Sequence, residues 1–126
     1  MGPWLARPFF GQLDFPLPLA ALVPAVACGG ANGVLEEISY RGAMQAWLGR
    51  VMPLAWAIGL PALAFGIVHA GPDVLALLPV HIALMAAVGV AGGIARARLG
   101  SLWIPIGVHA GADIALYVGL ACRAAA

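Results

Sequence analysis

The sequence predicts an all-α membrane protein, a polytopic bundle of about four transmembrane helices preceded by an interfacial N-terminal segment. Of its 126 residues, 63% are hydrophobic and only 9% are charged, and the mean hydropathy is +1.01. A soluble domain carries about a quarter charged residues, so this composition excludes an ordinary soluble fold. A transmembrane helix needs about 20 apolar residues, and the chain therefore has room for about four spans in one domain.

Residues 1–16 are predicted to lie at the membrane surface rather than across it. The segment carries charged and proline residues, and its aromatic side chains suit the headgroup region. These aromatic residues are Trp4, Phe9, Phe10 and Phe15. Residues 17–126 are then predicted to form the transmembrane core.

Four helices are expected in this core, with ends set by prolines, glycines and charged residues. Their expected ranges are 17–47, 53–69, 74–95 and 102–121. Pro61 falls inside the second helix, which a membrane tolerates because neighbouring groups satisfy the freed backbone. The turn signals are Gly71-Pro72-Asp73, after the second helix, and Arg96, Arg98 and Gly100, which are expected to close the third.

Pairs of glycines four residues apart indicate where helices approach closely. Such pairs let the backbones of membrane helices come together, although glycine is common throughout this chain. The pairs are Gly29 with Gly33, Gly89 with Gly93, and Gly107 with Gly111. Each pair is therefore either a packing surface or a result of how common glycine and alanine are in this chain.

The charge distribution excludes some partners and favours one orientation. A net charge of +1 without a basic run gives no case for nucleic-acid binding. The loops after the first and third helices hold three arginines, against two on the other side, which slightly favours a cytoplasmic position for those loops. The three are Arg50, Arg96 and Arg98, and the two are Arg7 and Arg123. Cys28 and Cys122 are expected to be free thiols in apolar surroundings.

The most informative feature is a group of charges inside the first helix, Glu36-Glu37 followed by Arg41. Each ionised side chain at bilayer depth costs roughly 2.5–3.5 kcal/mol, which makes such residues candidates for function. Glu37 and Arg41 are four residues apart, the spacing of a salt bridge on one helix face. Glu36 is turned about 100° away, so it should have different surroundings, and Asn32 lies one turn earlier where it could hydrogen-bond Glu36.

The later helices contribute three histidines. Phe65 lies one turn before His69, and His109 and Asp113 share a face of the fourth helix. At 1.5 Å per residue, Glu36, His69 and His109 lie about 10–22 Å from the same membrane side, so we expect them to face a common cavity. His81 is interpreted as a helix–helix hydrogen-bond partner.

Two chemistries fit this set of side chains. The carboxylate could take a proton from water with one histidine assisting, while the other histidine and Asp113 steady a developing oxyanion. Two histidines and a glutamate could instead hold zinc. Spacing alone does not choose between them.

Three motifs together resemble the CPBP family of intramembrane proteases, which includes the type II CAAX prenyl endopeptidases and bacterial (ABI) immunity proteins. The first is EExxxR, formed by Glu36, Glu37 and Arg41; the second is FxxxH, ending at His69; the third is HxxxD, formed by His109 and Asp113. The stretch GSLWIP at 100–105 is also typical of this family. The resemblance covers residues 33–117.

The resemblance implies a role for each motif residue. Glu36 and His69 would activate the hydrolytic water, His109 and Asp113 would form the oxyanion side, and Glu37 with Arg41 would give structural support. Asp113 differs from the asparagine of the prenyl endopeptidases. The expected mechanism needs no metal; if the enzyme depends on zinc, its ligands would be Glu36, His69 and His109.

We therefore expect an intramembrane endopeptidase that hydrolyses a peptide bond in or near the bilayer. Its partners would be membrane lipid and a peptide or membrane-protein substrate, and it could also form a homo-oligomer. Its expected location is the cytoplasmic membrane of a prokaryote. The alternative is a non-catalytic immunity or scaffold protein that keeps the motif residues as structural contacts. A proton-relaying transport subunit is more remote, since the chain lacks internal repeats.

Overall fold

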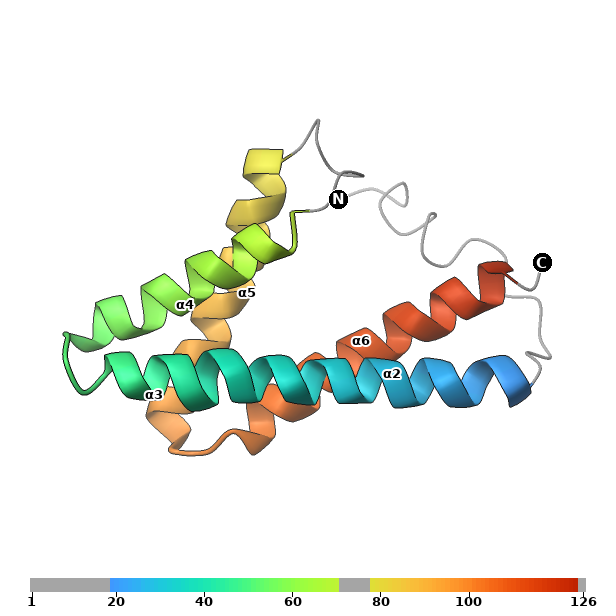
Figure 1. Ribbon diagram of the computed structural model, residues 1–126, viewed down its shortest axis with the longest axis horizontal. Coiled ribbons are helices and arrows are strands. Elements are labelled where there is room, and N and C mark those ends of the chain that lie inside the picture. Colours follow the sequence, from blue (N-terminus) through green and yellow to red (C-terminus); the bar gives the residue numbers. More distant parts are fainter. Residues whose placement is uncertain (1–18, 71–77, 125–126) are drawn as a thin grey trace. The chain divides into compact units, whose positions relative to one another are not determined.

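The computed structural model describes residues 19–70 and 78–124, and every regular element in these residues is a helix. In chain order the elements are α2 (Leu19–Glu37), the π-helix η1 (Ile38–Met44), α3 (Gln45–Leu48), α4 (Leu54–Val68), α5 (Leu78–Leu99) and α6 (Trp103–Ala124), as Figure 1 shows. The predicted all-α class is confirmed. The predicted interfacial segment 1–16 and the predicted turn at 71–73 lie outside the described residues.

The first helix is continuous but changes type. α2, η1 and α3 follow one another without a break, so residues 19–48 form the helix that the sequence predicts at 17–47. The π-helix was not expected; its i→i+5 bonds widen the helix, and such turns frequently mark functional sites. It begins directly after Glu36 and Glu37 and contains Arg41. The change in helix type therefore falls within the charged motif.

The remaining helices are found where the sequence places them, with two later ends. Pro61 lies inside α4, as predicted. α5 continues to Leu99, four residues beyond the predicted end, because long arginine side chains can extend toward water without ending a helix. Gly100, with φ of 66°, ends α5, and its N–H donates to the Arg96 carbonyl over 3.1 Å. α6 likewise continues to Ala124.

The chain forms two compact units, residues 1–35 with 106–126 and residues 36–105. In the first unit, Gly29 and Gly33 bring α2 against α6. A Cβ on Gly29 would lie 2.7 Å from the Ile114 nitrogen, and one on Gly33 would lie 2.6 Å from the Ala110 Cα. This confirms the first glycine pair as a packing surface.

Gly107 and Gly111 do not form such a surface. A Cβ on either residue would meet nothing within 4 Å, and both residues are exposed. Among the described residues this pair therefore packs against no neighbour, because glycine spacing alone does not say which face of a helix meets another.

The second unit is built on the contact between α4 and α5. A Cβ on Gly89 would lie 2.8 Å from the Ala62 Cα, and one on Gly93 would lie 2.8 Å from the Ile58 Cγ2. The second glycine pair is therefore also a packing surface. Phe65, on the same face of α4, is the largest side chain that is completely buried.

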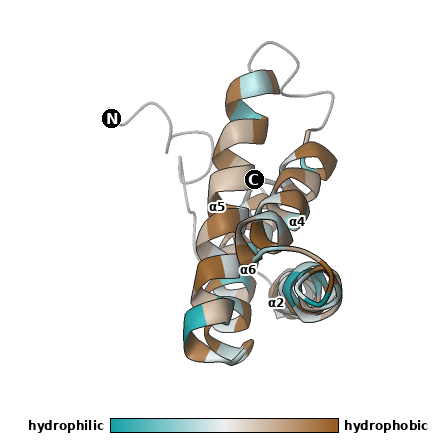
Figure 2. Ribbon diagram, turned by 90° about the vertical axis from the view of Figure 1, so that its left-hand side faces the viewer, coloured by the Kyte–Doolittle hydropathy of each residue, from teal (hydrophilic) through white to brown (hydrophobic). Residues whose placement is uncertain are grey.

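Among the described residues, two helices are long and apolar enough to cross a membrane, Leu78–Leu99 and Trp103–Ala121. Only 11% and 6% of their most apolar stretches are buried, unlike the core helix of a soluble protein, and neither stands near the N-terminus. α4 is equally apolar but shorter, with 15 residues. Figure 2 shows the apolar residues along these helices. Such continuous exposed apolar surface is what lipid covers.

Candidate active site

Glu37 and Arg41 form a buried ion pair. The Arg41 Nη1 lies 2.9 Å from the Glu37 Oε1, and both side chains are almost completely buried. Arg41 also donates from Nη2 to the Gly89 carbonyl over 3.3 Å, and its guanidinium lies 4.8 Å from the centre of the Phe65 ring. The predicted salt bridge is confirmed. Because it is enclosed by η1, α4 and α5, this pair holds helices together.

The guanidinium packs closely against Gly92, where a side chain would crowd it. A Cβ on Gly92 would lie 3.2 Å from both Nε and Nη2 of Arg41. One turn further along, the Gln45 Nε2 donates to the Gly93 carbonyl over 2.9 Å. The first helix thus binds two backbone carbonyls of α5 through Arg41 and Gln45. Neither Gln45 nor Gly92 was identified from the sequence. Because residues four apart lie on one face of a helix, Gln45 could have been expected on the same face as Arg41.

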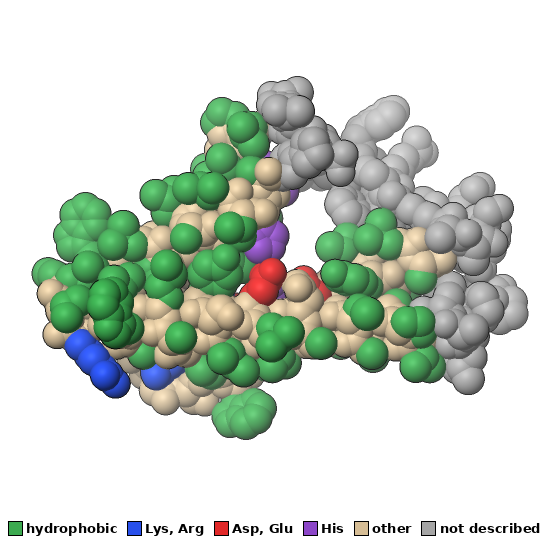
Figure 3. All heavy atoms as spheres, in the orientation of Figure 1, with side chains coloured by type: hydrophobic (Ala, Val, Ile, Leu, Met, Phe, Trp, Pro, Cys, Tyr) green, Lys and Arg blue, Asp and Glu red, His purple; other side chains and the backbone are tan. Residues whose placement is uncertain are grey.

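Glu36 has different surroundings from Glu37, as the 100° rotation predicts. Its Oε2 lies 3.5 Å from the Nε2 of His69, and the two side chains are 22% and 28% exposed, respectively. Both side chains are thus partly exposed, although the Glu36 Oε2 itself is buried, whereas Glu37 and Arg41 are enclosed. Figure 3 shows acidic and histidine side chains at an otherwise largely apolar surface.

The His69 ring is held in one orientation by Phe65. The His69 Nδ1 lies 2.8 Å from the Phe65 carbonyl oxygen, and the two ring centres are 4.2 Å apart. A carbonyl oxygen only accepts hydrogen bonds, so Nδ1 carries the proton in the neutral imidazole. The unprotonated Nε2 then faces Glu36. Tyr40 packs edge-on against Phe65, with ring centres 5.4 Å apart, and supports this arrangement from η1.

His109 and Asp113 form a second pair in the other unit. The His109 Nε2 lies 3.7 Å from the Asp113 Oδ2, and these side chains are mostly buried, at 13% and 16% exposed. The Asn32 Nδ2 donates to the same oxygen over 2.9 Å. The expectation that Asn32 bonds Glu36 was wrong, because the close approach of α2 and α6 at Gly33 places Asp113 within reach of the amide.

The site residues therefore lie in two groups. Residues 36–105 bring together Glu36 with His69, and Glu37 with Arg41. The other unit brings together His109, Asp113 and Asn32. A cavity shared by the two groups stays a prediction. His81 is half-buried and hydrogen-bonds none of the described residues.

Neither unit assembles a metal-ligand set in the residues that the structure describes. No three His, Cys, Asp or Glu side chains gather there in a way that could hold an ion. Each unit offers one carboxylate with one imidazole, Glu36 with His69 and Asp113 with His109. A zinc site with the predicted ligands Glu36, His69 and His109 would need side chains from both units.

Exposed apolar helices, a buried ion pair and a partly exposed carboxylate–imidazole pair define a class, the polytopic membrane proteins with ionisable groups inside the helical bundle. Residues 18–115 match the model of one protein family, described as Type II CAAX prenyl endopeptidase Rce1-like. The match covers most of the chain and every residue of the two groups, and the chain belongs to this family.

No curated protein and no solved structure matches the chain. The resemblance to the CPBP family is confirmed. At family level the protein is a membrane-integral, CAAX-type protease with a peptide or protein substrate.

Proposed function

We propose that the protein is an intramembrane endopeptidase in which Glu36 and His69 activate the hydrolytic water. The observation that carries this proposal is the distance of 3.5 Å between the Glu36 Oε2 and the His69 Nε2, both in partly exposed side chains. Glu37 is excluded from this role because it is buried against Arg41. A carboxylate beside an oriented imidazole, with access to water, is a competent acid–base pair.

Two neighbouring groups can accept from a water molecule here, the Glu36 carboxylate and the unprotonated Nε2 of His69. Glu36 takes a proton from a water molecule held at its carboxylate, while the His69 Nε2 accepts the hydrogen bond from the other water hydrogen. The water oxygen attacks the peptide carbonyl carbon, and the carbonyl electron pair moves onto its oxygen. When this intermediate collapses, the C–N bond breaks and Glu36 returns its proton to the amine nitrogen. The products are a carboxylic acid and an amine, and transfer of the acid proton leaves a carboxylate and an ammonium group.

His109 and Asp113 are proposed to act on the oxyanion. A protonated ring nitrogen of His109 donates to the negative oxygen, which lowers the barrier. A bare carboxylate beside this oxygen would oppose the same step, but the Asn32 amide donates to Asp113 over 2.9 Å and offsets its charge. Asp113 is thus proposed to position His109 rather than to contact the substrate.

We propose a mechanism without a metal. The residues come from separate helices without a paired motif such as HExxH, in which two ligands and a base share one helix. The alternative is zinc bound by Glu36, His69 and His109, which would polarise the carbonyl and lower the pKa of bound water. The proposed location is the cytoplasmic membrane of a prokaryote, and the proposed substrate a peptide segment in or near the bilayer.

A catalytic and a scaffold role make different demands on Glu36. In an immunity or scaffold protein, Glu36 and His69 would serve only as a helix contact. We therefore propose to incubate the protein, purified in nanodiscs, with a library of transmembrane and juxtamembrane peptides and to identify new termini by mass spectrometry. Glu36→Gln and His69→Gln should fold normally and cleave nothing.

The matched control is His81→Gln, because His81 is a third histidine of the bundle outside both groups. It should cleave as the wild type does. Cleavage retained in folded Glu36→Gln would overturn the proposed role of this carboxylate. A wild-type protein that cleaves no peptide of the library would favour the scaffold alternative.

A further inference from the structure

A basic recess lies beside the ion pair, at the end of the second unit where α3 and α5 finish. It has a volume of about 380 Å³, and its polar walls are Arg41, Gln45, Arg50 and Arg96. None of the carboxylates in the described residues lines it. Its size is near the lower end of the range of about 300–1,000 Å³ for small-molecule pockets, so it suits a single small polar group.

Arg41 is already neutralised, but the other two arginines are not. The described carboxylates are Glu36, Glu37 and Asp113, and their printed partners are His69, Arg41 and His109, respectively. No carboxylate of the described residues pairs with Arg50 or Arg96. The recess therefore carries an excess of positive charge that an anion would balance.

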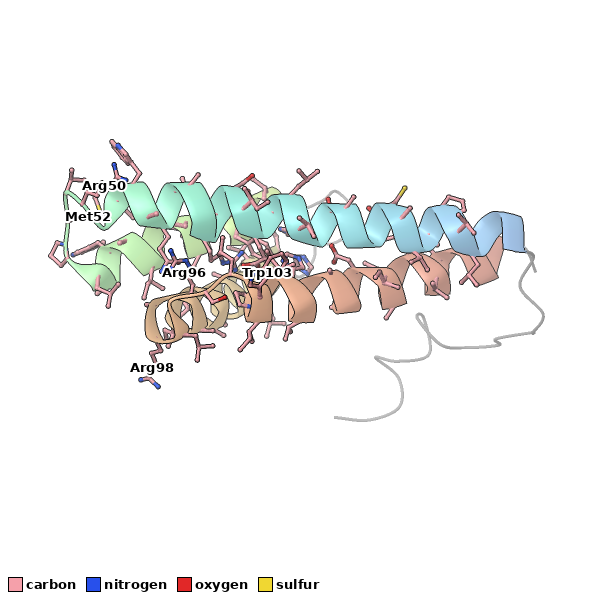
Figure 4. All side chains as sticks on the ribbon, turned by 90° about the horizontal axis from the view of Figure 1, so that it is seen from below. Arg50, Met52, Arg96, Arg98 and Trp103 are labelled. Atoms are coloured by element: carbon pink, nitrogen blue, oxygen red, sulfur yellow. The ribbon has the colours of Figure 1, made fainter. Side chains whose placement is uncertain are left out.

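Arg96 also has an unsatisfied donor. Its Nε is buried and has no hydrogen-bond partner among the described residues. A buried donor without an acceptor is costly, and the cost is greater for a charged group. Figure 4 shows Arg96 pointing toward α3, whereas Arg98, two residues later on α5, points away from it. Complementing the dipole of α5 would need only a basic residue in its last turn, which Arg98 supplies.

The position of the recess indicates the kind of anion. Arg96 stands in the last turn of a helix long enough to cross a membrane, so the recess lies at headgroup depth. Exposed tryptophans also stand near helix ends of this unit, and this residue is enriched at the membrane–water interface. They are Trp47 and Trp56, on either side of the loop between α3 and α4, and Trp103, at the start of α6.

We propose that this recess is a binding site for the phosphate of an anionic membrane lipid. Its phosphate oxygens accept from the guanidinium groups of Arg96 and Arg50, and its acyl chains lie along the exposed apolar surface beside Leu54. Basic recesses between membrane helices are suited to anionic headgroups. The bound lipid would neutralise the charge beside the ion pair of Arg41 and so stabilise the second unit. This proposal does not rest on the catalytic role of Glu36.

The test compares lipids of the same chain length on the protein in detergent. Short-chain phosphatidylglycerol, short-chain phosphatidylcholine and inorganic phosphate are each titrated, and binding is followed by thermal unfolding and by native mass spectrometry. We expect phosphatidylglycerol to raise the Tm and to appear as a retained adduct, with no effect of phosphatidylcholine. Inorganic phosphate acting as strongly as the lipid would overturn the assignment to a lipid.

Charge-matched variants test the site itself. Arg96→Gln and Arg50→Gln should each weaken binding of phosphatidylglycerol about fivefold, the contribution expected of one arginine near an anionic surface. Arg98→Gln removes the same charge from the same helix outside the recess and should bind as the wild type does. Equal losses in all three variants would mean diffuse surface attraction and reject the site. If Arg96→Gln does not fold, Arg50→Gln decides alone.

Discussion

Phe65 holds His69 through both its backbone and its ring. The Phe65 carbonyl oxygen lies 2.8 Å from the His69 Nδ1, and the two rings are 4.2 Å apart. The carbonyl sets which nitrogen carries the proton, and the ring limits rotation of the imidazole. The FxxxH motif thus has a physical meaning, because a helical turn is the spacing at which one residue can do both.

Replacing the Phe65 ring should separate the two contributions. Phe65→Leu keeps the backbone carbonyl but removes the aromatic contacts with Tyr40 and His69, which we expect to cost about 0.5–1.5 kcal/mol each. Peptidase activity should fall more than stability does, because His69 loses its orientation. Unfolding in denaturant and cleavage rate measure the two effects. Leu63→Ala on the exposed side of α4 is the control; a similar loss of activity there would contradict the role of the ring.

Removing Arg41 should destabilise the protein. Arg41→Ala leaves Glu37 buried without its partner, and we expect a loss of roughly 3–5 kcal/mol. Thermal unfolding measures this loss. The control is Arg98→Ala, which removes an exposed arginine and should change stability little. A stable but inactive Arg41→Ala protein would reverse the assigned roles of Arg41 and Glu36.

Gly92→Ala tests the space around the guanidinium. The new Cβ would lie 3.2 Å from Nε and Nη2 of Arg41, so the side chain must move and its bond to the Gly89 carbonyl must lengthen. We expect a loss of about 1–3 kcal/mol, typical of overpacking. Gly59→Ala is the control, since a Cβ there meets nothing within 4 Å.

At Gly59 the same substitution should stabilise the helix by about 0.5–1 kcal/mol. Thermal unfolding of the two variants gives the comparison directly. Equal effects at both positions would show that helix propensity, rather than contact with Arg41, governs residue 92.

Replacing Asp113 with asparagine should leave stability nearly unchanged, whereas replacing it with alanine should lower stability. In Asp113→Asn the side-chain carbonyl still accepts from the Asn32 Nδ2, so stability should change by less than about 0.5 kcal/mol. Asp113→Ala leaves the half-buried Asn32 amide without its acceptor, at a cost of about 1–3 kcal/mol. Unfolding experiments separate the two. Equal stability of both variants would show that the Asn32 bond contributes nothing.

Metal dependence can be measured on active protein. A mechanism carried by Glu36 and His69 alone predicts activity that survives exhaustive chelation and no stoichiometric zinc by elemental analysis. Activity lost on chelation and restored by zinc would instead assign Glu36, His69 and His109 as ligands. The protease family would be unchanged by that result.

The sequence predicted the parts of the structure that depend on short spacings. Glu37 with Arg41 and His109 with Asp113 are four residues apart, so helix geometry alone brings them together. It also predicted the four helices, because the length of each apolar stretch can be counted along the sequence. Gly100 was correctly expected at the end of α5.

Contacts between helices were harder to predict. Nothing in the sequence said that Asn32 would turn to Asp113 rather than Glu36, because that choice depends on how closely α2 approaches α6. The π-helix was missed for a similar reason, since residues 38–44 have no local sequence signal distinct from an α-helix. The use of Gly89 and Gly93 as hydrogen-bond acceptors requires knowing which helix faces them.

Those two glycines give α5 an unusual kind of tolerance. Arg41 and Gln45 bind the carbonyls of Gly89 and Gly93, so no substitution at these two positions can delete the acceptors. What a substitution changes is the spacing between helices, since Ala62 and Ile58 occupy the space that a side chain would need. At Gly89 that space is closed by the Cα of Ala62, at 2.8 Å, as well as by its Cβ, at 2.9 Å, so even Ala62→Gly would leave the side chain of Gly89→Ala against backbone. Position 89 therefore has to remain glycine for as long as α4 and α5 keep this distance.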